Sequence, residues 1–261
     1  MKIHLLIAIG IISLLVIFYF IFFSNKVNEN PITKIESKIA KIERQLEIFE
    51  EERISKEWNQ MIRKYLTLPL DNGYGSHAIV LLAALYVSKS GPILELGMGT
   101  ASTPLLHRLA YEQKRFLLSA DSDQRWINYF SSFTENNTLH QLKYIEIKSE
   151  MGIEWASANL AYYKNWTVVF IDHRPGSRRQ FDLMGYSHRS DIVVLHDTEQ
   201  SSLYQYSQGL LLYRYQYRFT KLKTYTDALS RKNETLIKMI RHLLESTPDY
   251  YFSNITLNEN V

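Results

Sequence analysis

One stretch, residues 91–107 with the sequence GPILELGMGTASTPLLH, limits the fold of this chain more than any other. Residues 93–96 have the apolar character of a short buried strand, and Gly97 and Gly99 follow it as a tight turn. Ser102 is suited to cap the next helix, and Pro104 to its first turn, where a missing N–H has no cost. A strand, a glycine-rich turn and a helix N-terminus form a cradle for a nucleotide-type ligand. An ordinary strand–turn–helix connection is the alternative, and the later strands must decide.

Polar side chains end each of the later strands that the sequence predicts. Apolar runs predict strands at residues 116–120, 142–147, 167–171 and 191–195, and the third of these has the character of a central parallel strand. Parallel sheets carry their ligands at the carboxyl ends of their strands. The side chains found there should therefore meet on one rim: Glu95, Asp121, Asp172, His196 and Asp197.

Asp121 is the candidate for contact with a ribose. An acid at the tip of the second strand accepts hydrogen bonds from ribose hydroxyls in nucleoside-binding folds of this type. The alternative is that Asp121 or Asp123 caps the helix that begins near Gln124.

Four segments together resemble class I S-adenosylmethionine-dependent methyltransferases: ILELGMGTASTPLLH, LLSADSD, VVFIDHRPGSRRQFDLM and DIVVLHDTE. They look most like a branch with a DH-x-PG-x-RR element and an HDTE element. The resemblance implies an α/β fold: a Rossmann-like, seven-stranded sheet, mostly parallel with one antiparallel strand, and helices on both faces. It implies that S-adenosylmethionine binds through Glu95, Gly97, Gly99, Asp121, Ser149, Glu150 and Asp172, with Ser149 and Glu150 beside the adenine.

The order of the motifs is also similar to that of catechol-type O-methyltransferases, which use a divalent metal such as Mg²⁺. That similarity implies Asp172, His196 and Asp197 as metal ligands, with His196 standing where that family has a carboxylate. The lysine base of that family has no match here, because Arg174 and Pro175 occupy its region. His196 is then the predicted general base, with Asp172 and Asp197 beside it, since an imidazole titrates near neutral pH.

Three arginines, Arg174, Arg178 and Arg179, follow the tip of the fourth strand. Guanidinium groups suit carboxylates and phosphates, so one interpretation is an anionic acceptor such as a uronic acid or a phosphorylated sugar. The other is that they form salt bridges that hold the rim together, with Asp121, Asp182, Asp197 or Glu199 as partners.

The N-terminus predicts a membrane anchor within residues 1–24. Residues 3–23 carry no charge and are long enough to cross a bilayer as a helix. A cleaved signal peptide is the alternative, but the run is long and lacks a small-x-small cleavage site. Lysines after the span favour a cytoplasmic domain. Four N-x-S/T sites, at Asn136, Asn165, Asn233 and Asn254, favour a glycosylated lumenal one, and we expect a single-pass protein of the ER or Golgi with a lumenal domain.

Residues 25–66 are predicted to form a helical stalk. Apolar side chains recur at heptad spacing, and this pattern predicts either a short coiled coil that forms a homodimer or a helix that packs on the domain. The stripe comprises Ile32, Ile35, Ile39, Ile42, Leu46 and Phe49, and Arg53 interrupts it.

The rest of the chain, residues 67–261, is predicted to be one methyltransferase-like domain. Residues 68–75 form a loop in which Asn72, Gly73 and Tyr74 either contact ligand or simply connect elements. Further helices are predicted at 77–87, 153–163, 203–212 and 233–245, and an antiparallel strand pair at 214–222 and 224–230, with a loosely held tail after Pro248.

Composition narrows the function. The chain has 261 residues, a net charge of +3 and no cysteine, which gives no reason to expect nucleic acid and excludes thiolate chemistry. The favoured function is methyl transfer to a hydroxyl of a small molecule or glycan. The alternatives are a catalytically inactive scaffold of the same fold and an NAD-dependent oxidoreductase. The last is the weakest, because Ser102 replaces the final glycine of G-x-G-x-x-G.

Overall fold

A computed structural model describes residues 31–73, 75–135, 137–158, 160 and 163–252. Contacts divide the chain into two units, Met1–Glu57 and Trp58–Val261. The predicted anchor within residues 1–24 and the glycosylation sites at Asn136 and Asn254 lie outside the described residues. Within the described ranges, no helix combines the length and the apolar character that a membrane span requires.

The described part of the first unit is helix α2, which spans Pro31–Tyr65 and continues into the second unit. The helix continues through Arg53, whose guanidinium pairs with Glu50 and Glu57, one turn away on either side. Two members of the heptad stripe, Ile42 and Phe49, are exposed, whereas Ile35 is buried.

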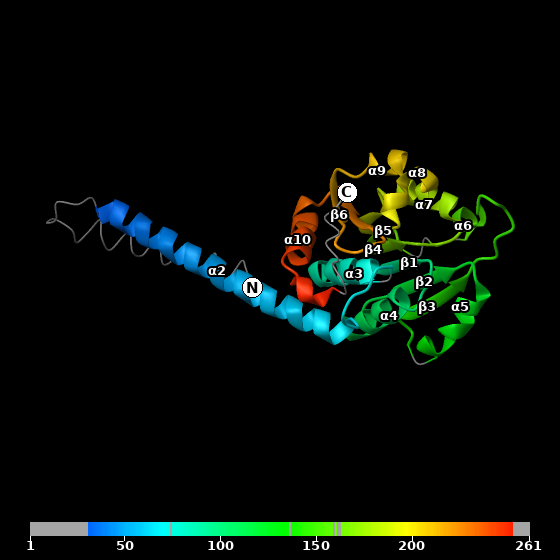
Figure 1. The fold of residues 1–261 in the computed structure, drawn as a ribbon, viewed down its shortest axis with the longest axis horizontal. Helices are drawn as coiled ribbons and strands as arrows, with labels where there is room; N and C mark the ends of the chain where they lie inside the picture. The colour runs from blue at the N-terminus through cyan, green and yellow to red at the C-terminus, as the bar shows by residue number, and fades with distance from the viewer. Residues whose placement is uncertain (1–30, 74, 136, 159, 161–162, 253–261) are drawn as a thin grey trace, which may run out of the picture. The chain divides into compact units, whose positions relative to one another are not determined.

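The second unit is built on one seven-stranded sheet, in the order β3-β2-β1-β4-β5-β7-β6 (Figure 1). The first five strands are parallel, and β7 runs antiparallel between β5 and β6. This confirms the predicted mixed sheet with an antiparallel pair at one edge. The strands are β1 Ile93–Leu96, β2 Leu117–Asp121, β3 His140–Tyr144, β4 Trp166–Ile171, β5 Ser190–His196, β6 Tyr215–Phe219 and β7 Thr226–Ser230.

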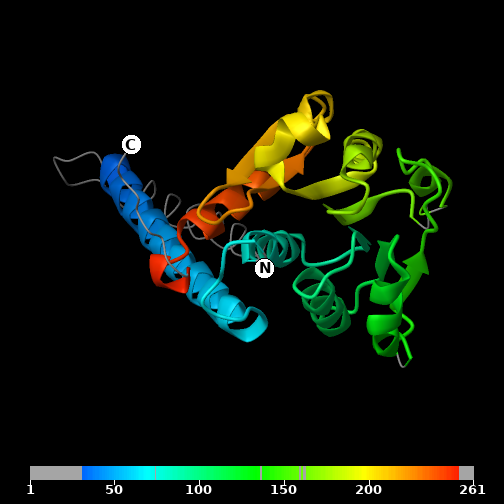
Figure 2. The ribbon, with the colours of Figure 1, turned by 45° about the vertical axis from the view of Figure 1, so that its right-hand side comes forward.

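Helices cover both faces of the sheet. Helix α3 (Gly75–Ser88) packs on β4, β5 and β7, and it also contacts α4 (Ser102–Glu112) and α10 (Glu234–Glu245) (Figure 2). Helix α7 (Arg179–Tyr186) packs on β4 and β5 from the other side (Figure 1). The central strands β1 and β4 are almost wholly buried between these layers, which is why their sequences are continuous apolar runs.

Several predicted boundaries were wrong. Strand β3 is His140–Tyr144 rather than residues 142–147; it pairs with β2 from His140 onward, and the buried His140 ring has its Nε2 3.0 Å from the Ser119 hydroxyl. Helix α6 is only Glu154–Ser157, and the Ser157 hydroxyl bonds back to Glu154 O at the point where the helix ends. Ala101, not Ser102, is the N-cap of α4.

The predicted helix at 203–212 is instead two short helices, α8 (Ser201–Tyr204) and α9 (Ser207–Leu210). Gln205 between them adopts the left-handed conformation, with φ +57°. The break turns Tyr206 into the core, where it is fully buried. Burial of one large side chain therefore outweighs the continuity of the helix.

The tail beyond Pro248 was predicted to be loosely held, and up to Phe252 this is wrong. A 3₁₀ turn spans Asp249–Tyr251, and Tyr251 and Phe252 are buried. Leu70 N donates to Tyr251 O over 2.7 Å, and the Arg63 guanidinium donates to the Tyr251 hydroxyl over 2.9 Å. This segment closes the domain against the end of α2.

Candidate functional site

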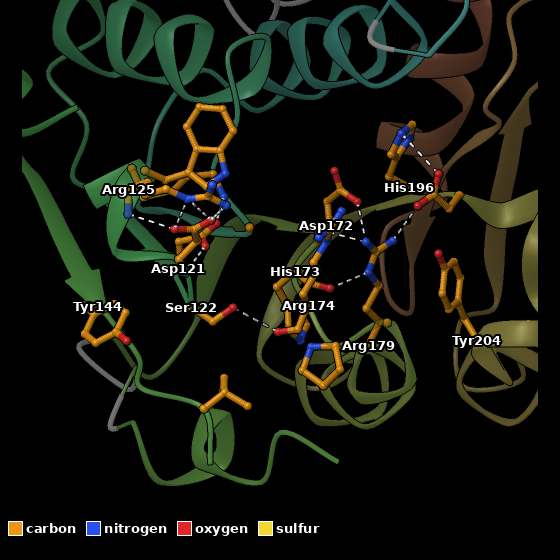
Figure 3. Close-up of a pocket in the computed structure, with 18 of the residues that line it drawn as sticks. Asp121, Ser122, Arg125, Tyr144, Asp172, His173, Arg174, Arg179, His196 and Tyr204 are labelled. Atoms are coloured by element: carbon orange, nitrogen blue, oxygen red, sulfur yellow. Dashed lines mark hydrogen bonds and ion pairs between the residues drawn. The ribbon is translucent and has the colours of Figure 1, made fainter. Parts of the chain in front are cut away.

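A cavity of about 910 Å³ lies at the carboxyl ends of β1, β2, β4 and β5 (Figure 3). Its volume falls in the range of small-molecule sites. It is lined by most of the predicted site residues, namely Gly97, Asp121, Ser149, Glu150, Asp172, His196 and Asp197. The predicted convergence of the strand ends is confirmed, whereas Glu95 and Gly99 lie outside this lining.

The two glycines of the turn have different structural roles. Gly97 has φ +95°, and a Cβ there would lie 2.5 Å from the carbonyl carbon of Asp172. Its lack of a side chain lets the loop press against the end of β4. Gly99 has no such neighbour, since the nearest atom to a Cβ would be Ser102 Oγ at 3.7 Å. Gly97 is therefore required by the fold, and Gly99 leaves open space at the turn.

Glu95 is fully buried behind this turn. Its Oε1 accepts a hydrogen bond from Thr103 Oγ1 over 3.0 Å, and Thr103 Oγ1 in turn accepts from Gly99 N. Burial raises the pKa of Glu95 to about 7, although hydrogen bonds from Ser119 and neighbouring hydroxyls oppose the shift. Glu95 links the strand, the turn and α4, and so positions the loop from behind.

Asp121 organises the second strand end. Its two carboxylate oxygens accept backbone hydrogen bonds from Met98 N, at 2.6 Å, and Asp123 N, at 2.7 Å. The capping role that the sequence left open belongs to Asp123, which accepts from Arg125 N and pairs with the Arg125 side chain. Burial raises the pKa of Asp121. Asp121 thus fastens two loops while its carboxylate lines the cavity.

Ser149 and Glu150, predicted beside an adenine, both line the cavity. The Ser149 hydroxyl donates to Glu154 over 2.8 Å and accepts from Ile153 N, so it shapes the loop before α6. Glu150 is exposed. Trp126, Tyr144 and Ile147 add apolar surface on this side of the cavity, and the sequence analysis missed them. In the sequence, only their position close to the end of a predicted strand pointed to these three residues.

Arg179 pairs with two acids, Asp172 and Asp197, on another side of the cavity. Its guanidinium lies 2.8 Å from Asp172 Oδ1 and 2.9 Å from Asp197 Oδ2, and it also donates to the carbonyls of Asp172 and His173 (Figure 3). Arg178 makes two hydrogen bonds to Asp182. The salt-bridge interpretation is confirmed for these two arginines. Arg174 is exposed at the cavity and forms no ion pair with a described residue.

Asp172 and His196 are the titratable groups of this side. Burial raises the pKa of Asp172, and the charges of Asp197 and Asp121 add to this against the pull of Arg179. Burial lowers the pKa of His196 to about 3, and Arg179 contributes. His196 is therefore neutral at physiological pH and a weaker base than the sequence predicted.

Both ring nitrogens of His196 have hydroxyl neighbours. Nδ1 lies 3.0 Å from Thr226 Oγ1, and Thr226 is in turn hydrogen-bonded to Ser76. Nε2 lies 2.9 Å from Thr224 Oγ1 and 3.5 Å from Asp197 Oδ1. A hydroxyl can donate or accept, so either nitrogen of the neutral ring can carry the hydrogen.

His77 is a site residue that sequence reasoning missed. It lies near the start of α3, is buried, and its ring meets the His196 ring edge-on with centroids 4.5 Å apart. Potential ligand atoms of His77, Asp172 and His196 all lie within 4.8 Å of one another. In the predicted metal set Asp197 held the place that His77 takes in this group, and Arg179 pairs with both Asp172 and Asp197. One signal was available, since His77 is the polar exception in the apolar run HAIVLLAALYV.

Comparison with known proteins gave structural neighbours only. Neither protein-family models nor curated protein sequences match the chain. The O-methyltransferase TomG from Streptomyces achromogenes, solved in complex with SAM, is 15% identical, with a TM-score of 0.45 over 67% of this chain and 88% of its own. A putative O-methyltransferase from Klebsiella pneumoniae is 12% identical, with a TM-score of 0.45 over 69% and 88%. The METTL16 methyltransferase domain is 16% identical, with a TM-score of 0.41 over 60% and 66%.

The strand order itself distinguishes the candidate fold families. Dinucleotide-binding folds of dehydrogenases have the all-parallel order 3-2-1-4-5-6, whereas this sheet inserts an antiparallel strand between its last two positions. This argues against the NAD-dependent alternative. With its seven-stranded 3-2-1-4-5-7-6 sheet and its glycine turn and acids at the strand ends, the chain has the fold of the class I S-adenosylmethionine-dependent methyltransferases that its sequence resembles.

Proposed function

We propose that this protein binds S-adenosylmethionine in the cavity and transfers its methyl group to a hydroxyl of a small molecule or glycan. One observation carries the proposal: Asp121 lies at one end of the cavity, and Asp172 and His196 lie toward the other (Figure 3). A nucleoside held by Asp121 at the first end would direct its reactive group toward the second.

The chemistry of the cavity fits this cofactor. Five carboxylates and three guanidinium groups line it, and this acidic excess suits the positive sulfonium and ammonium groups of S-adenosylmethionine. Asp121 offers carboxylate oxygens to ribose hydroxyls, and Trp126, Tyr144 and Ile147 offer apolar surface to a purine. Arg174 has no ion-pair partner among the described residues and can meet the carboxylate of the cofactor.

S-adenosylmethionine, when bound, supplies an electrophilic methyl group on a positively charged sulfur. The residues of this chain must hold the acceptor oxygen in line with the carbon–sulfur bond and remove its proton. The new bond joins oxygen to the methyl carbon, the electrons of the broken bond pass to sulfur, and the proton passes to a base. We assign the acceptance of that proton to Asp172 or His196, because both side chains line the cavity.

The first test is binding of S-adenosylmethionine to the Asp121→Ala variant. We expect affinity to fall by about 1.5–3 kcal/mol, the contribution of hydrogen bonds to a charged group. Isothermal titration calorimetry measures this, with circular dichroism to verify folding. Asp123→Ala is the matched control, because Asp123 follows the same strand but caps α5 and pairs with Arg125. Equal affinity losses in both variants would contradict a ribose role for Asp121.

A catalytically inactive scaffold of the same fold is the second candidate. Incubation with radiolabelled cofactor and pools of hydroxylated acceptors separates the two. Transfer of label supports the enzyme, and tight cofactor binding without transfer to any pool supports the scaffold.

We also propose that residues 1–24 anchor the protein in the membrane of the ER or Golgi, with the domain in the lumen. The uncharged run at 3–23 supports anchoring, and the exposed acceptor sites Asn165 and Asn233 support the lumenal side. Full-length protein should resist carbonate extraction from membranes and lose mass on treatment with an endoglycosidase. Release by carbonate would contradict the anchor, and an unchanged mass would contradict the orientation.

A further inference from the structure

His77 brings a second imidazole to the rim, and this changes the ligand chemistry of the site. We propose that His77, Asp172 and His196 form a binding site for a divalent transition-metal ion. Their candidate ligand atoms come from α3, the end of β4 and the end of β5, and all lie within 4.8 Å of one another. The purpose of the ion rests on the proposed methyl transfer, but its binding can be measured separately.

His196 is arranged as metal-binding histidines commonly are. Its Nδ1 lies 3.0 Å from Thr226 Oγ1, and Thr226 is in turn hydrogen-bonded to Ser76. A hydrogen bond from the second ring nitrogen fixes the orientation of a ligating imidazole. When Nδ1 donates to Thr226, the lone pair is on Nε2, which has the Thr224 hydroxyl as its neighbour at 2.9 Å.

The local charge favours a cation. Arg179 pairs with Asp197 and with Oδ1 of Asp172, so two carboxylates face one guanidinium and leave a net negative charge. The second oxygen of Asp172 accepts no hydrogen bond from a described residue. Asp172 can therefore keep its salt bridge and still present one oxygen to an ion. Arg179 likewise pairs with Oδ2 of Asp197, whose Oδ1 lies 3.5 Å from Nε2 of His196.

The donor set selects the kind of metal. Two imidazoles and one carboxylate suit Zn²⁺, Co²⁺, Fe²⁺ or Mn²⁺, whereas Mg²⁺ prefers oxygen ligands. Metal–nitrogen distances are about 2.0–2.1 Å, so ligand atoms around one ion lie closer together than 4.8 Å, and binding would draw the three side chains inward. Three protein ligands leave coordination positions open to an acceptor oxygen, whose pKa the ion would lower.

The test is titration of the full-length protein with Co²⁺, followed by visible absorption and calorimetry. The chain has no cysteine, so a thiolate cannot contribute to the spectrum. We expect one Co²⁺ per chain, with the stronger visible bands of a site of low coordination number. His77→Gln, His196→Gln and Asp172→Asn should each weaken binding on the order of 100-fold, and Zn²⁺ should compete where Mg²⁺ does not.

Two histidine variants provide matched controls. His188 is exposed beside Arg231, and His107 forms a separate pair with His140, with ring nitrogens 3.0 Å apart. His188→Gln and His107→Gln should bind Co²⁺ as the wild type does. Wild-type protein that binds no Co²⁺, or binding that survives all three substitutions in the triad, would overturn the proposal.

Binding of S-adenosylhomocysteine to the same samples separates the two proposals. Cofactor binding without Co²⁺ binding would contradict the metal site and agree with the proposed function. Co²⁺ binding without cofactor binding would contradict the proposed function and agree with the metal site. If a histidine variant fails to fold, the Asp172→Asn variant and the wild-type spectrum still decide, because Asp172 is partly exposed at the rim.

Discussion

At the scale of single residues, the glycine turn combines a structural and an open position. Gly97 is surrounded by the backbone of Asp172 and His173 and has a positive φ, whereas Gly99 has neither constraint. The same distinction applies to the acids, since Glu95 supports the turn from the core and Asp121 lines the cavity. A motif of adjacent residues therefore divides into positions that build the site and positions that face it.

This difference predicts unequal effects of two similar substitutions. Gly97→Ala should lower the free energy of unfolding by about 1–3 kcal/mol or more, because it adds strain at a positive φ and a clash with the end of β4. Gly99→Ala should change stability little, because a methyl group there meets open space. Thermal unfolding of both variants measures the effect, and equal melting temperatures would contradict this account.

At the scale of elements, α2 carries an apolar stripe. We interpret this stripe as the contact surface for α2 of a second copy of the chain. Ile42 and Phe49 lie on the heptad stripe and are exposed, and Ile48 is also exposed but lies off the stripe. A coiled coil buries positions a and d and leaves the others in solvent. In the proposed homodimer, Ile42 and Phe49 would therefore lie in the contact between the two helices.

The prediction follows from this spacing. Ile42→Asp and Phe49→Asp should convert a dimer of the chain into a monomer, because each places a charge in the buried seam. Ile48→Asp is the matched control and should leave the dimer intact. Analytical ultracentrifugation in a detergent matched for density gives the masses. A monomeric wild type would refute the coiled coil and favour a helix that serves only as a spacer.

At the scale of the whole molecule, buried neutral histidines make the fold sensitive to acid. Burial lowers the pKa values of His77, His140 and His196 to about 3, against about 6.5 for the exposed side chain. The unfolded chain therefore binds protons below pH 6.5 that the folded chain does not. Each such histidine stabilises the fold fully above that pH, and this contribution is lost as pH falls.

His140 allows this effect to be measured away from the candidate site. Below pH 6.5 the wild type should lose about 1.4 kcal/mol per pH unit on account of His140, or roughly 2 kcal/mol at pH 5. His140→Gln should not lose this amount, so its stability relative to the wild type should rise by that difference between pH 7.5 and 5. Urea unfolding at both pH values gives the comparison. Carboxyl groups with raised pKa values, such as Glu95, change stability with pH in the opposite direction to His140. Their effect is the same in the wild type and the variant, so it cancels from the difference between the two proteins. A constant difference at the two pH values would mean that His140 is protonated in the fold.

The sequence by itself determined the layout of the sheet and the rim of the cavity. Strands β1, β4 and β5 are apolar runs that can only be buried between layers, and the polar residues that end them must emerge at the same edge. Periodicity and turn residues are local properties, so a single chain displays them directly. For the same reason the glycine turn and Asp121 are recognisable from the order of residues alone.

Only the tertiary structure decided which of these polar groups pair and which remain available. Arg179 pairs with Asp172 and Asp197, Thr226 contacts Nδ1 of His196, and α3 brings His77 to the rim. Most of these partners are far apart in the chain, and several could have exchanged roles without changing the hydrophobic pattern. Distances of about 3 Å and burial select among them, and neither is a local property of sequence.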